Sequence, residues 1–381
     1  MKIVFLVSNL GSGGSERTVA YMSDYLAQKG WDVTVMSLSG ENFYELDPKV
    51  RCVNLNIPYV PFAAKSALKW FYHFVRRRRL PPRVIKKIKP DIVFCILPRT
   101  VPYLSAKTKK SYCLIGSERT APSHSSRKSI QRKTEAFSLC DGVIFQTQRA
   151  LEFYPDMIQK RGRVIPNAIG NPFVAQAVKP TQRAKKISAM GRLADEKDYP
   201  TLLRAFATVH RKYSDYRLEI YGEGPDKEQL IRLSQTLGIQ DRVDFCGADP
   251  KAILHISDAS CYVLCSIFEG MPNALMEAMA VGLPCVSTDC PNGPAELIRN
   301  GENGLLVPVG DAEKLAEAIL KMLDDPSFAE ACGERAKDLR NTHSMENMAQ
   351  AYMNYIEEVY LRTKTPQQVN AQKNYKGENY E

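Results

Sequence analysis

The chain has 381 residues, of which 44% are hydrophobic and 25% charged, the composition of an ordinary globular protein. This length exceeds one ordinary hydrophobic core and favours two domains. No run approaches the ~18 apolar residues that a membrane-spanning helix needs, and the apolar start at 3–7 is too short for a signal peptide. The ten cysteines form no Cys-x-x-Cys pair, which favours free buried thiols in a reducing cytosol over disulfides or a zinc site.

The net charge of +10 is distributed unevenly along the chain. Up to Pro180 there are 29 Lys and Arg against 12 Asp and Glu, a charge of +17, whereas the remainder has 23 against 30, a charge of −7. The two halves therefore differ in kind. We expect the basic half to meet an anionic partner.

Apolar strand-like runs alternate with helical stretches, the pattern of parallel sheets that helices cover on both faces. The first half has such runs at 3–7, 33–37, 50–57, 92–97, 111–116, 142–146 and 163–169. A polar linker, 175–185, separates them from runs at 187–193, 218–221, 243–247, 259–265, 284–288 and 304–307. The pattern predicts an α/β protein with two doubly wound, Rossmann-like domains, 1–175 and 186–344. A helix over 345–362 and a disordered polar tail, 363–381, follow.

The first strand ends in a glycine-rich loop that contains Gly13 and Gly14. The fingerprint for nicotinamide cofactors would need a further glycine where Glu16 stands, so the spacing excludes it. Glycines before a helix still let backbone N–H groups approach a phosphate closely. Gly13 and Gly14 are therefore candidate phosphate-binding residues, and a plain tight turn explains the loop about equally well.

Residues 48–90 contain no Asp or Glu and twelve Lys or Arg. Apolar residues at a spacing of three to four predict an amphipathic helix over 63–79, which Pro81 and Pro82 should end. The basic segment 63–89 combines aromatic and cationic side chains, which suits an anionic membrane surface and a lipid-linked acceptor. Its candidate contacts are Trp70, Arg76, Arg77, Arg78 and Arg79. The alternative is a helix packed on the first sheet with a solvated basic face.

The chemically richest stretch is 265–279. An apolar strand leads to Glu269, and a sharp turn brings the chain to a helix that carries Glu277. The N–H groups of a helix start suit a phosphate, and the two carboxylates accept hydrogen bonds from hydroxyls. A nucleotide sugar has this pattern, because its diphosphate lies between two polyols. A surface turn with one exposed helical Glu is the simpler interpretation of either carboxylate alone.

A second loop at a strand end carries two cations, Arg192 and Lys197, in the pattern Gly-Arg-Leu-x-x-x-Lys. Two cations in such a place can neutralise the charge of a leaving diphosphate. In isolation the pair would be an ordinary solvated loop. Its combination with the carboxylates of the other loop favours a shared site.

The pattern Phe-Glu-Gly-x-Pro-x-x-x-x-Glu-Ala-x-Ala around Glu269, together with the Arg192 and Lys197 motif, resembles the signature of retaining glycosyltransferases of family 4. The resemblance runs from residue 1 to about 361 and implies the GT-B fold, in which two domains face a cleft. It implies transfer of a hexosyl unit from a nucleoside diphosphate sugar, with Arg192, Lys197 and Glu269 as catalytic residues. The other donor-binding residues that it implies, besides the glycines of the first loop, are Gly270, Met271, Pro272, Asn273, Ala274 and Glu277.

Resemblance to bacterial polysaccharide and lipid-linked oligosaccharide enzymes further implies a UDP-linked donor, an N-acetylhexosamine among the sugars, and a polyprenyl diphosphate-linked or polysaccharide acceptor. It places the enzyme in the cytoplasm, peripherally on the inner face of the cell membrane. No cofactor is expected, and no metal either, since no Asp-x-Asp cluster stands out. Arg119 occupies a position where the family often has a cleft-facing His, and it could bind donor or acceptor oxygens.

Two other functions remain as alternatives. A nucleotide-sugar epimerase would share the architecture, but it would release no free nucleoside diphosphate. A non-catalytic binder of an anionic polymer, including nucleic acid, would explain the basic half. The basic half, however, lacks the aromatic platforms or groove-reading motifs that a nucleic-acid binder needs.

Overall fold

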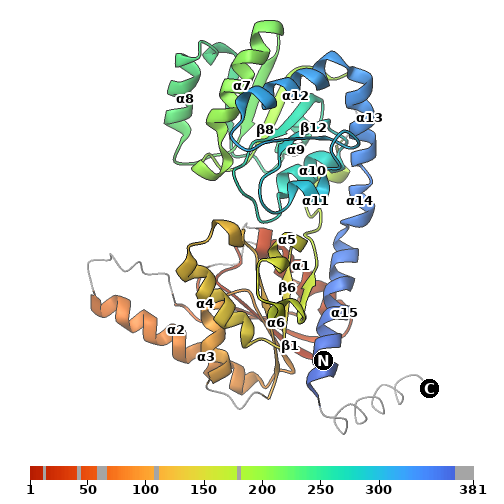
Figure 1. Cartoon of the computed structure of the whole chain (residues 1–381). Coiled ribbons are helices and arrows are strands. Elements are labelled where there is room, and N and C mark those ends of the chain that lie inside the picture. Colours follow the sequence, from red (N-terminus) through yellow and green to blue (C-terminus); the bar gives the residue numbers. More distant parts are fainter. Residues whose placement is uncertain (12–13, 41–43, 58–66, 107–110, 178–181, 365–381) are drawn as a thin grey trace, which may run out of the picture. The chain divides into compact units, whose positions relative to one another are not determined.

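The computed structural model of the chain describes residues 1–11, 14–40, 44–57, 67–106, 111–177 and 182–364 (Figure 1). Its internal contacts divide it into two compact units. One comprises Met1–Pro166 together with Glu346–Glu381, and the other comprises Asn167–Met345. We call them the first and the second domain. The chain enters the second domain after Pro166 and leaves it after Met345.

The first domain is built on a parallel sheet in which seven strands are described, in the order β3-β2-β1-β4-β5-β6-β7. They are β1 (Lys2–Val7), β2 (Asp32–Ser37), β3 (Arg51–Asn54), β4 (Ile92–Cys95), β5 (Cys113–Ser117), β6 (Gly142–Phe145) and β7 (Gly162–Val164). Strand β1 pairs with β2 on one side and with β4 on the other. Residues 3–7 of β1 are at most 1% exposed, as expected for a strand covered on both faces.

The helices of this domain are α1 (Gly14–Gln28), α2 (Ala67–Ile88), α3 (Val101–Ala106), α4 (Arg127–Ser138), α5 (Gln148–Glu152), α6 (Asp156–Gln159) and α15 (Met345–Thr363). Helix α15 follows the whole second domain in the sequence, yet it packs on the first sheet. The ring of Tyr352 lies 5.9 Å from that of Phe94 on β4, and the N–H of Val143 on β6 donates to the Tyr355 hydroxyl at 3.0 Å. The first domain is therefore completed by the end of the chain.

Helix α2 does not end where the sequence indicated. We expected Pro81 and Pro82 to end it, but the helix continues through both prolines to Ile88. A proline inside a helix removes a backbone hydrogen bond and costs ~3 kcal/mol. Both prolines are buried, and Ile85 is fully buried in the core of the first domain. Packing on that core offsets the cost. The expected start of the helix, at residue 63, lies outside the described residues.

The second domain repeats the architecture with six described strands in the order β10-β9-β8-β11-β12-β13, again all parallel. They are β8 (Ala184–Met190), β9 (Arg217–Tyr221), β10 (Val243–Gly247), β11 (Ala259–Leu264), β12 (Cys285–Thr288) and β13 (Leu305–Val307). The helices are α7 (Tyr199–Lys212), α8 (Lys227–Thr236), α9 (Ala252–Ile256), α10 (Asn273–Ala280), α11 (Pro294–Leu297), α12 (Ala312–Asp324), α13 (Pro326–Ala336) and α14 (Leu339–Thr342).

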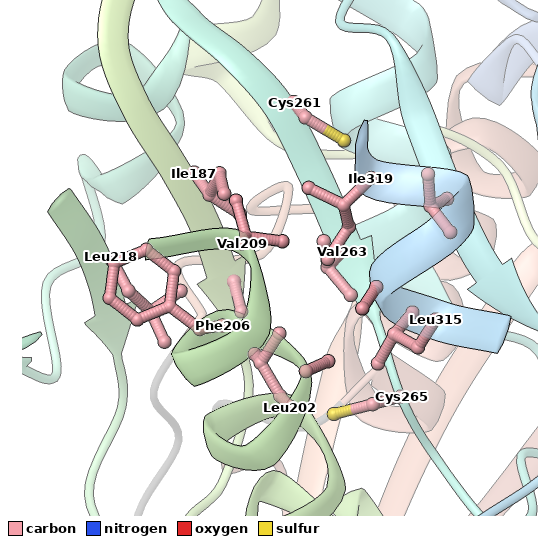
Figure 2. Packing of buried hydrophobic residues seen from close by; sticks show 14 of the residues in the cluster. Ile187, Leu202, Phe206, Val209, Leu218, Cys261, Val263, Cys265, Leu315 and Ile319 are labelled. Atoms are coloured by element: carbon pink, nitrogen blue, oxygen red, sulfur yellow. The ribbon is translucent and has the colours of Figure 1, made fainter. Parts of the chain in front are cut away.

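One part of the core of the second domain lies between the sheet and helices α7 and α12. Figure 2 shows Leu202 and Phe206 of α7 and Ile319 of α12 among the side chains of β8 and β11. Leu202 and Phe206 are four residues apart, the spacing that places side chains on one face of a helix. The cluster extends to Cys265, immediately after β11. The core therefore supports the segment in which the candidate site residues begin.

Two doubly wound parallel sheets confirm the fold class predicted from the sequence. Most strands agree with the predicted runs, because a strand buried on both faces is itself an apolar run. Ends differ by a few residues, and the run 163–169 forms only the short β7. Within the described ranges, no helix is long and apolar enough to cross a lipid bilayer.

Candidate functional site

The segment after β11 forms a turn and then the mostly buried helix α10. The helix begins at Asn273, directly after Pro272. A proline is tolerated there because the first N–H groups of a helix have no partner within the helix. Gly282, with φ of +82°, lies just beyond the other end in the left-handed conformation that ends many helices. The strand, turn and helix predicted for this stretch are therefore present.

Lys197 and Glu269 form a close ion pair in this domain. Nζ of Lys197 lies 2.6 Å from Oε1 of Glu269, and the two side chains are only 18% and 12% exposed. The Ser266 hydroxyl donates to the same oxygen at 2.7 Å. In the described part of the chain, both donors to this carboxylate go to Oε1, so Oε2 keeps its lone pairs for a ligand hydroxyl.

The loops that carry the pair are fastened to each other near the ends of β8 and β11. The N–H of Ile267 donates to the carbonyl oxygen of Glu196 at 2.9 Å, and Sγ of Cys265 donates to the carbonyl oxygen of Lys197, also at 2.9 Å. Strands β8 and β11 are neighbours in the sheet, so residues 72 positions apart in the sequence meet at one edge. The sheet topology thus assembles the pair.

Two thiols close to the pair are not activated nucleophiles. Burial raises the pKa of Cys265 well above its ordinary value. Burial also raises the pKa of Cys290 to about 12, and the nearby charge of Glu269 adds to that shift. Both thiols are therefore protonated at neutral pH, whereas a nucleophilic cysteine is a thiolate. Neither thiol is therefore a candidate nucleophile beside Lys197 and Glu269.

A pocket of about 430 Å³ lies within the second domain. It is lined from β8, β9, the loop after β10 and the first turns of α10, by Met190, Gly191, Arg192, Tyr221, Gly222, Glu223, Ala248, Asp249, Ala252, Asn273, Ala274 and Glu277. Four of the predicted donor-binding residues are among them: Arg192, Asn273, Ala274 and Glu277. The pocket has the size of a small-molecule site.

The other predicted residues of this domain lie outside the lining of the pocket. These are Lys197, Glu269, Gly270, Met271 and Pro272. The ion pair is nevertheless adjacent to it, because a Cβ built on pocket-lining Gly191 would lie 3.2 Å from Cε of Lys197.

Backbone packing at the pocket requires glycine at position 222. Gly222 has φ of +154°, and a Cβ built on it would lie only 1.9 Å from the carbonyl oxygen of Gly191. Any side chain at this position would push the ends of β8 and β9 apart. The close approach of these two strand ends shapes one wall of the pocket.

Two asparagines that the sequence did not single out contact the first turns of α10. Nδ2 of Asn167 donates to Oδ1 of Asn273 at 2.9 Å, and Nδ2 of Asn171 donates to Oε2 of Glu277 at 2.9 Å. Both asparagines belong to the segment that enters the second domain. Their signal in the sequence was turn propensity alone, which does not reveal partners 106 positions away.

The arrangement combines a region for an anion with acceptors for hydroxyls. Arg192 and the N–H groups at the start of α10 offer positive charge and donors to a phosphate. Glu277, which lines the pocket, and the Lys197–Glu269 pair next to the pocket offer carboxylate oxygens to hydroxyl groups. Across the residues that the structure describes, no three His, Cys, Asp or Glu side chains cluster as metal ligands would.

In the first domain, Arg119 is tied to protein groups from two other elements. Its Nη1 donates to the Tyr352 hydroxyl of α15 at 2.9 Å, and its Nη2 donates to Oγ1 of Thr18 in α1 at 2.8 Å. A role in binding donor or acceptor oxygens stays a prediction. Of the two loop glycines, Gly14 begins α1, and Gly13 lies outside the described residues.

The residue before Arg119 is a buried carboxylate that the sequence analysis did not consider. Glu118 is 2% exposed and accepts a hydrogen bond of 2.5 Å from the Tyr154 hydroxyl. Lys133 lies 3.0 Å from its Oε2, and the backbone N–H groups of Arg119 and Thr120 both donate to its Oε1 at 3.0 Å. Burial and Glu118 raise the pKa of Tyr154, so its hydroxyl stays a donor.

The arginines of α2 divide into two groups. Arg76 donates to the carbonyl oxygens of Asn56 and Leu55 at 3.2 and 3.1 Å, and Arg77 donates to that of Ile57 at 3.5 Å. Arg78 and Arg79 are exposed; Arg78 also lies over the ring of Tyr103, 4.6 Å from its centroid. The side chain of Trp70 lies outside the described residues.

Comparison with known proteins covers both halves of the chain. Residues 174–339 match the family model described as Glycosyl transferases group 1, and residues 12–170 match the model described as Glycosyltransferase Family 4. The chain belongs to the GT-B glycosyltransferases. Its two doubly wound sheets agree with that membership.

This glycosyltransferase is 25% identical over 358 residues to an uncharacterized glycosyltransferase of Haemophilus influenzae, with 92% of this chain and 98% of the relative covered. It is 26% identical over 365 residues to the GalNAc-α-(1→4)-GalNAc-α-(1→3)-diNAcBac-PP-undecaprenol α-1,4-N-acetyl-D-galactosaminyltransferase of Campylobacter jejuni, with 94% and 99% covered. A mutant of S. aureus TarM, solved with Fondaparinux, α-GlcNAc-glycerol and UDP, has the same fold. Its TM-score is 0.74 at 15% identity, over 93% of this chain and 100% of that chain.

Proposed function

We propose that this glycosyltransferase moves a hexosyl unit, with N-acetylhexosamines among the candidates, from a UDP-sugar to a sugar acceptor and retains the anomeric configuration. The supporting observation is the Lys197–Glu269 pair next to a pocket lined by Arg192 and Glu277. A nucleotide sugar needs cations and N–H groups at its diphosphate and acceptors at the hydroxyls on both sides. UDP is favoured as carrier because the TarM structure holds UDP.

In this reaction the acceptor hydroxyl attacks the anomeric carbon from the face that the diphosphate leaves. The bond between that carbon and the phosphate oxygen breaks, and the departing oxygen takes the proton of the acceptor. Lys197 and Arg192 neutralise the charge that builds on the leaving diphosphate. Oε2 of Glu269 accepts from donor-sugar hydroxyls, and Glu277 accepts from the ribose. These cations and the start of α10 supply the positive charge, so the reaction needs no metal ion.

An assay of transfer tests the proposal. Wild-type protein is incubated with UDP-N-acetylhexosamines or UDP-hexoses and a polyprenyl diphosphate-linked sugar, with and without a chelator. We expect release of UDP, an α-linked product from an α-linked donor, and equal rates in both conditions. A changed donor sugar without release of UDP would indicate an epimerase. Absence of donor binding and of turnover across the panel would refute a nucleotide-sugar enzyme.

The acceptor that we propose is a polyprenyl diphosphate-linked or polysaccharide intermediate. The Campylobacter jejuni relative supports it, because its name specifies an undecaprenol-linked sugar acceptor. A lipid-linked acceptor is anchored in the bilayer, so the enzyme works at the inner face of the cell membrane.

We assign the contact with that membrane to the outer face of α2. Phe71 and Tyr72 are each 56% exposed, and Arg78 and Arg79 are exposed on the same helix. Arg76 instead holds backbone carbonyl oxygens of the first domain, so the four arginines are not equivalent. Each cation near an anionic surface contributes about 1 kcal/mol.

Co-sedimentation with anionic and neutral liposomes at moderate salt tests this contact. Replacing Arg78 and Arg79 with Ser should lower binding to anionic liposomes roughly tenfold or more and leave donor binding unchanged. The matched double variant Arg211→Ser/Arg232→Ser removes two cations from helices of the second domain and should bind as wild type. Equal binding of all three proteins would end the idea.

A further inference from the structure

The hydroxyl of Ser266 is committed to the side chain of Glu269. It donates to Oε1 of that carboxylate at 2.7 Å, and Ser266 is fully buried. The spacing Ser-x-x-Glu is also that of a capping box, in which the serine hydroxyl would accept from a backbone N–H at the start of a helix. Residues 265–272 form no helix, however, and α10 starts only at Asn273. The hydroxyl therefore serves the carboxylate and caps no helix.

The backbone around Ser266 is fixed from both neighbouring strands of the sheet. At the end of β12, Oγ1 of the buried Thr288 donates to the carbonyl oxygen of Ser266 at 2.6 Å. In the loop after β8, the carbonyl oxygen of Glu196 accepts from the N–H of Ile267 at 2.9 Å. Strands β8 and β12 lie on either side of β11. A short side chain on such a backbone has little freedom, so the direction of its hydroxyl is set before any ligand binds.

In the described part of the chain, the other donor to this oxygen is Lys197, and it differs from the serine in freedom. Its Nζ lies 2.6 Å from Oε1 of Glu269. A lysine ammonium is a point charge on a flexible four-carbon stem, so it imposes little direction on its partner. In the proposed reaction Lys197 also neutralises the charge of the leaving diphosphate, which competes with Glu269 for the same cation. The lysine therefore supplies charge, whereas Ser266 supplies direction.

We infer that Ser266 is a positioning residue: it keeps Glu269 directed at the donor sugar while Lys197 is engaged with the leaving diphosphate. This inference rests on the proposed function. Ser266 is fully buried, so it acts on the donor only through Glu269. The carboxylate contacts the sugar at the reacting centre, where charge develops in the transition state. Loss of the hydroxyl should therefore lower kcat and leave donor KM nearly unchanged.

The variant Ser266→Ala removes the hydroxyl and changes no charge. We expect kcat to fall about tenfold, close to the lower end of what a hydrogen bond to a charged group is worth. Donor KM should change by less than about twofold, and the melting temperature by less than about 4 °C. Ser234→Ala is the matched control, because Ser234 is also buried and donates at 2.7 Å, but to the backbone carbonyl oxygen of Ile231 in α8. It should leave kcat unaltered.

A second background gives the decisive measurement. In Glu269→Ala the serine has no carboxylate to hold, so Ser266→Ala should cost almost nothing further there. The loss of kcat in Ser266→Ala alone should also not exceed the loss in Glu269→Ala, since the serine acts through that side chain. A role of Ser266 in the shape of the loop would instead lower kcat by the same factor in both backgrounds, because independent effects multiply.

Initial rates over a range of donor concentration, together with melting curves of every variant, measure these effects. An unchanged kcat in Ser266→Ala, or an equal loss in the two backgrounds, would overturn the inference. So would a fall in the melting temperature of roughly 10 °C, which would assign the hydroxyl to the stability of the fold. Failure of wild-type protein to turn over any nucleotide sugar would instead overturn the proposed function.

Discussion

Each domain carries a lysine–glutamate pair whose glutamate lies in the loop that follows a parallel strand. The two glutamates differ in how many hydrogen bonds they accept from the protein. Glu118 follows β5 directly, is 2% exposed, and binds Lys133, the Tyr154 hydroxyl and two backbone N–H groups. Glu269 lies in the loop after β11, is 12% exposed, and in the described chain receives Lys197 and Ser266 on one oxygen.

This difference separates a structural carboxylate from one that can take part in chemistry. A carboxylate has about four positions for donors, and those of Glu118 are filled by its own domain. Glu269 has capacity left, and the pocket is adjacent to its lysine. Both residues are glutamates in a loop after a parallel strand. The number of protein donors therefore distinguishes them better than either feature.

The largest effect on stability should come from breaking the Lys133–Glu118 pair, which we call the saturated pair because protein donors fill the positions around Glu118. Glu118→Ala leaves Lys133 and the Tyr154 hydroxyl without their buried partner, which costs about 3–5 kcal/mol. The melting temperature should fall by roughly 10 °C, measured by circular dichroism. Glu135→Ala, which removes an exposed glutamate of α4, serves as the control and should change it little. A melting temperature within about 2 °C of wild type in Glu118→Ala would show that saturation does not indicate a structural role.

Substitutions in the Lys197–Glu269 pair, which we call the open pair, should lower the turnover of the enzyme and leave its stability nearly unchanged. Lys197→Ala removes a cation that stabilises the leaving diphosphate, and we expect turnover to drop on the order of 10²-fold or more. Lys133→Ala is the matched variant of the saturated pair and should lower the melting temperature while it leaves turnover nearly intact. If Lys197→Ala keeps wild-type steady-state rates, the pair does not belong to the active site. Arg192→Ala should give a loss of the same kind.

A smaller change at the open pair sharpens the comparison further. Glu269→Gln keeps the size of the side chain and removes its charge, so the fold should persist and turnover should fall about tenfold with every accepted donor. A loss confined to one donor sugar would assign Glu269 to recognition of that sugar alone. Initial rates at saturating donor, together with melting curves, decide between these outcomes.

At the pocket, the expected effect is on binding. Glu277→Ala should raise the donor KM about tenfold and change kcat by less than about threefold, because its contacts are made equally before and in the transition state. Rates over a range of donor concentration measure both constants. A fall in kcat at unchanged KM would instead place Glu277 at the reacting centre.

The smallest predicted effect concerns His343, which lies just before the chain leaves the second domain. Burial lowers the pKa of His343 below its ordinary value, and its carbonyl oxygen accepts from the N–H of Ile169 at 2.8 Å. As the pH falls below that ordinary value, about 6.5, the unfolded chain binds a proton more readily than the folded chain. Stability should therefore decrease as the pH falls below about 6.5. His343→Asn should flatten this slope in urea unfolding between pH 5 and 8, and an unchanged slope would contradict the assignment.

Inspection of the amino-acid sequence was enough to predict the two α/β domains, most of their strands, and the turn and helix start around Asn273. These follow from local patterns: apolar runs for buried strands, helix formers between a proline and a glycine for α10. The two sequence motifs that resemble family 4 also predicted that Lys197 and Glu269 belong to one site. In the structure their side chains are in contact.

Contacts between residues far apart in the sequence could not be predicted in this way. The side chain of Arg119 donates to Tyr352 and Thr18, which lie far from it in the sequence, so these contacts could not be inferred from a local pattern. Helix α2 passes Pro81 and Pro82 because packing outweighs a local rule. Asn171 had the signal of a turn residue, and its bond to Glu277 depends on where the sheet carries α10. Local propensity acts over a few residues, whereas these contacts are set by the order of strands in a sheet, which no single segment encodes.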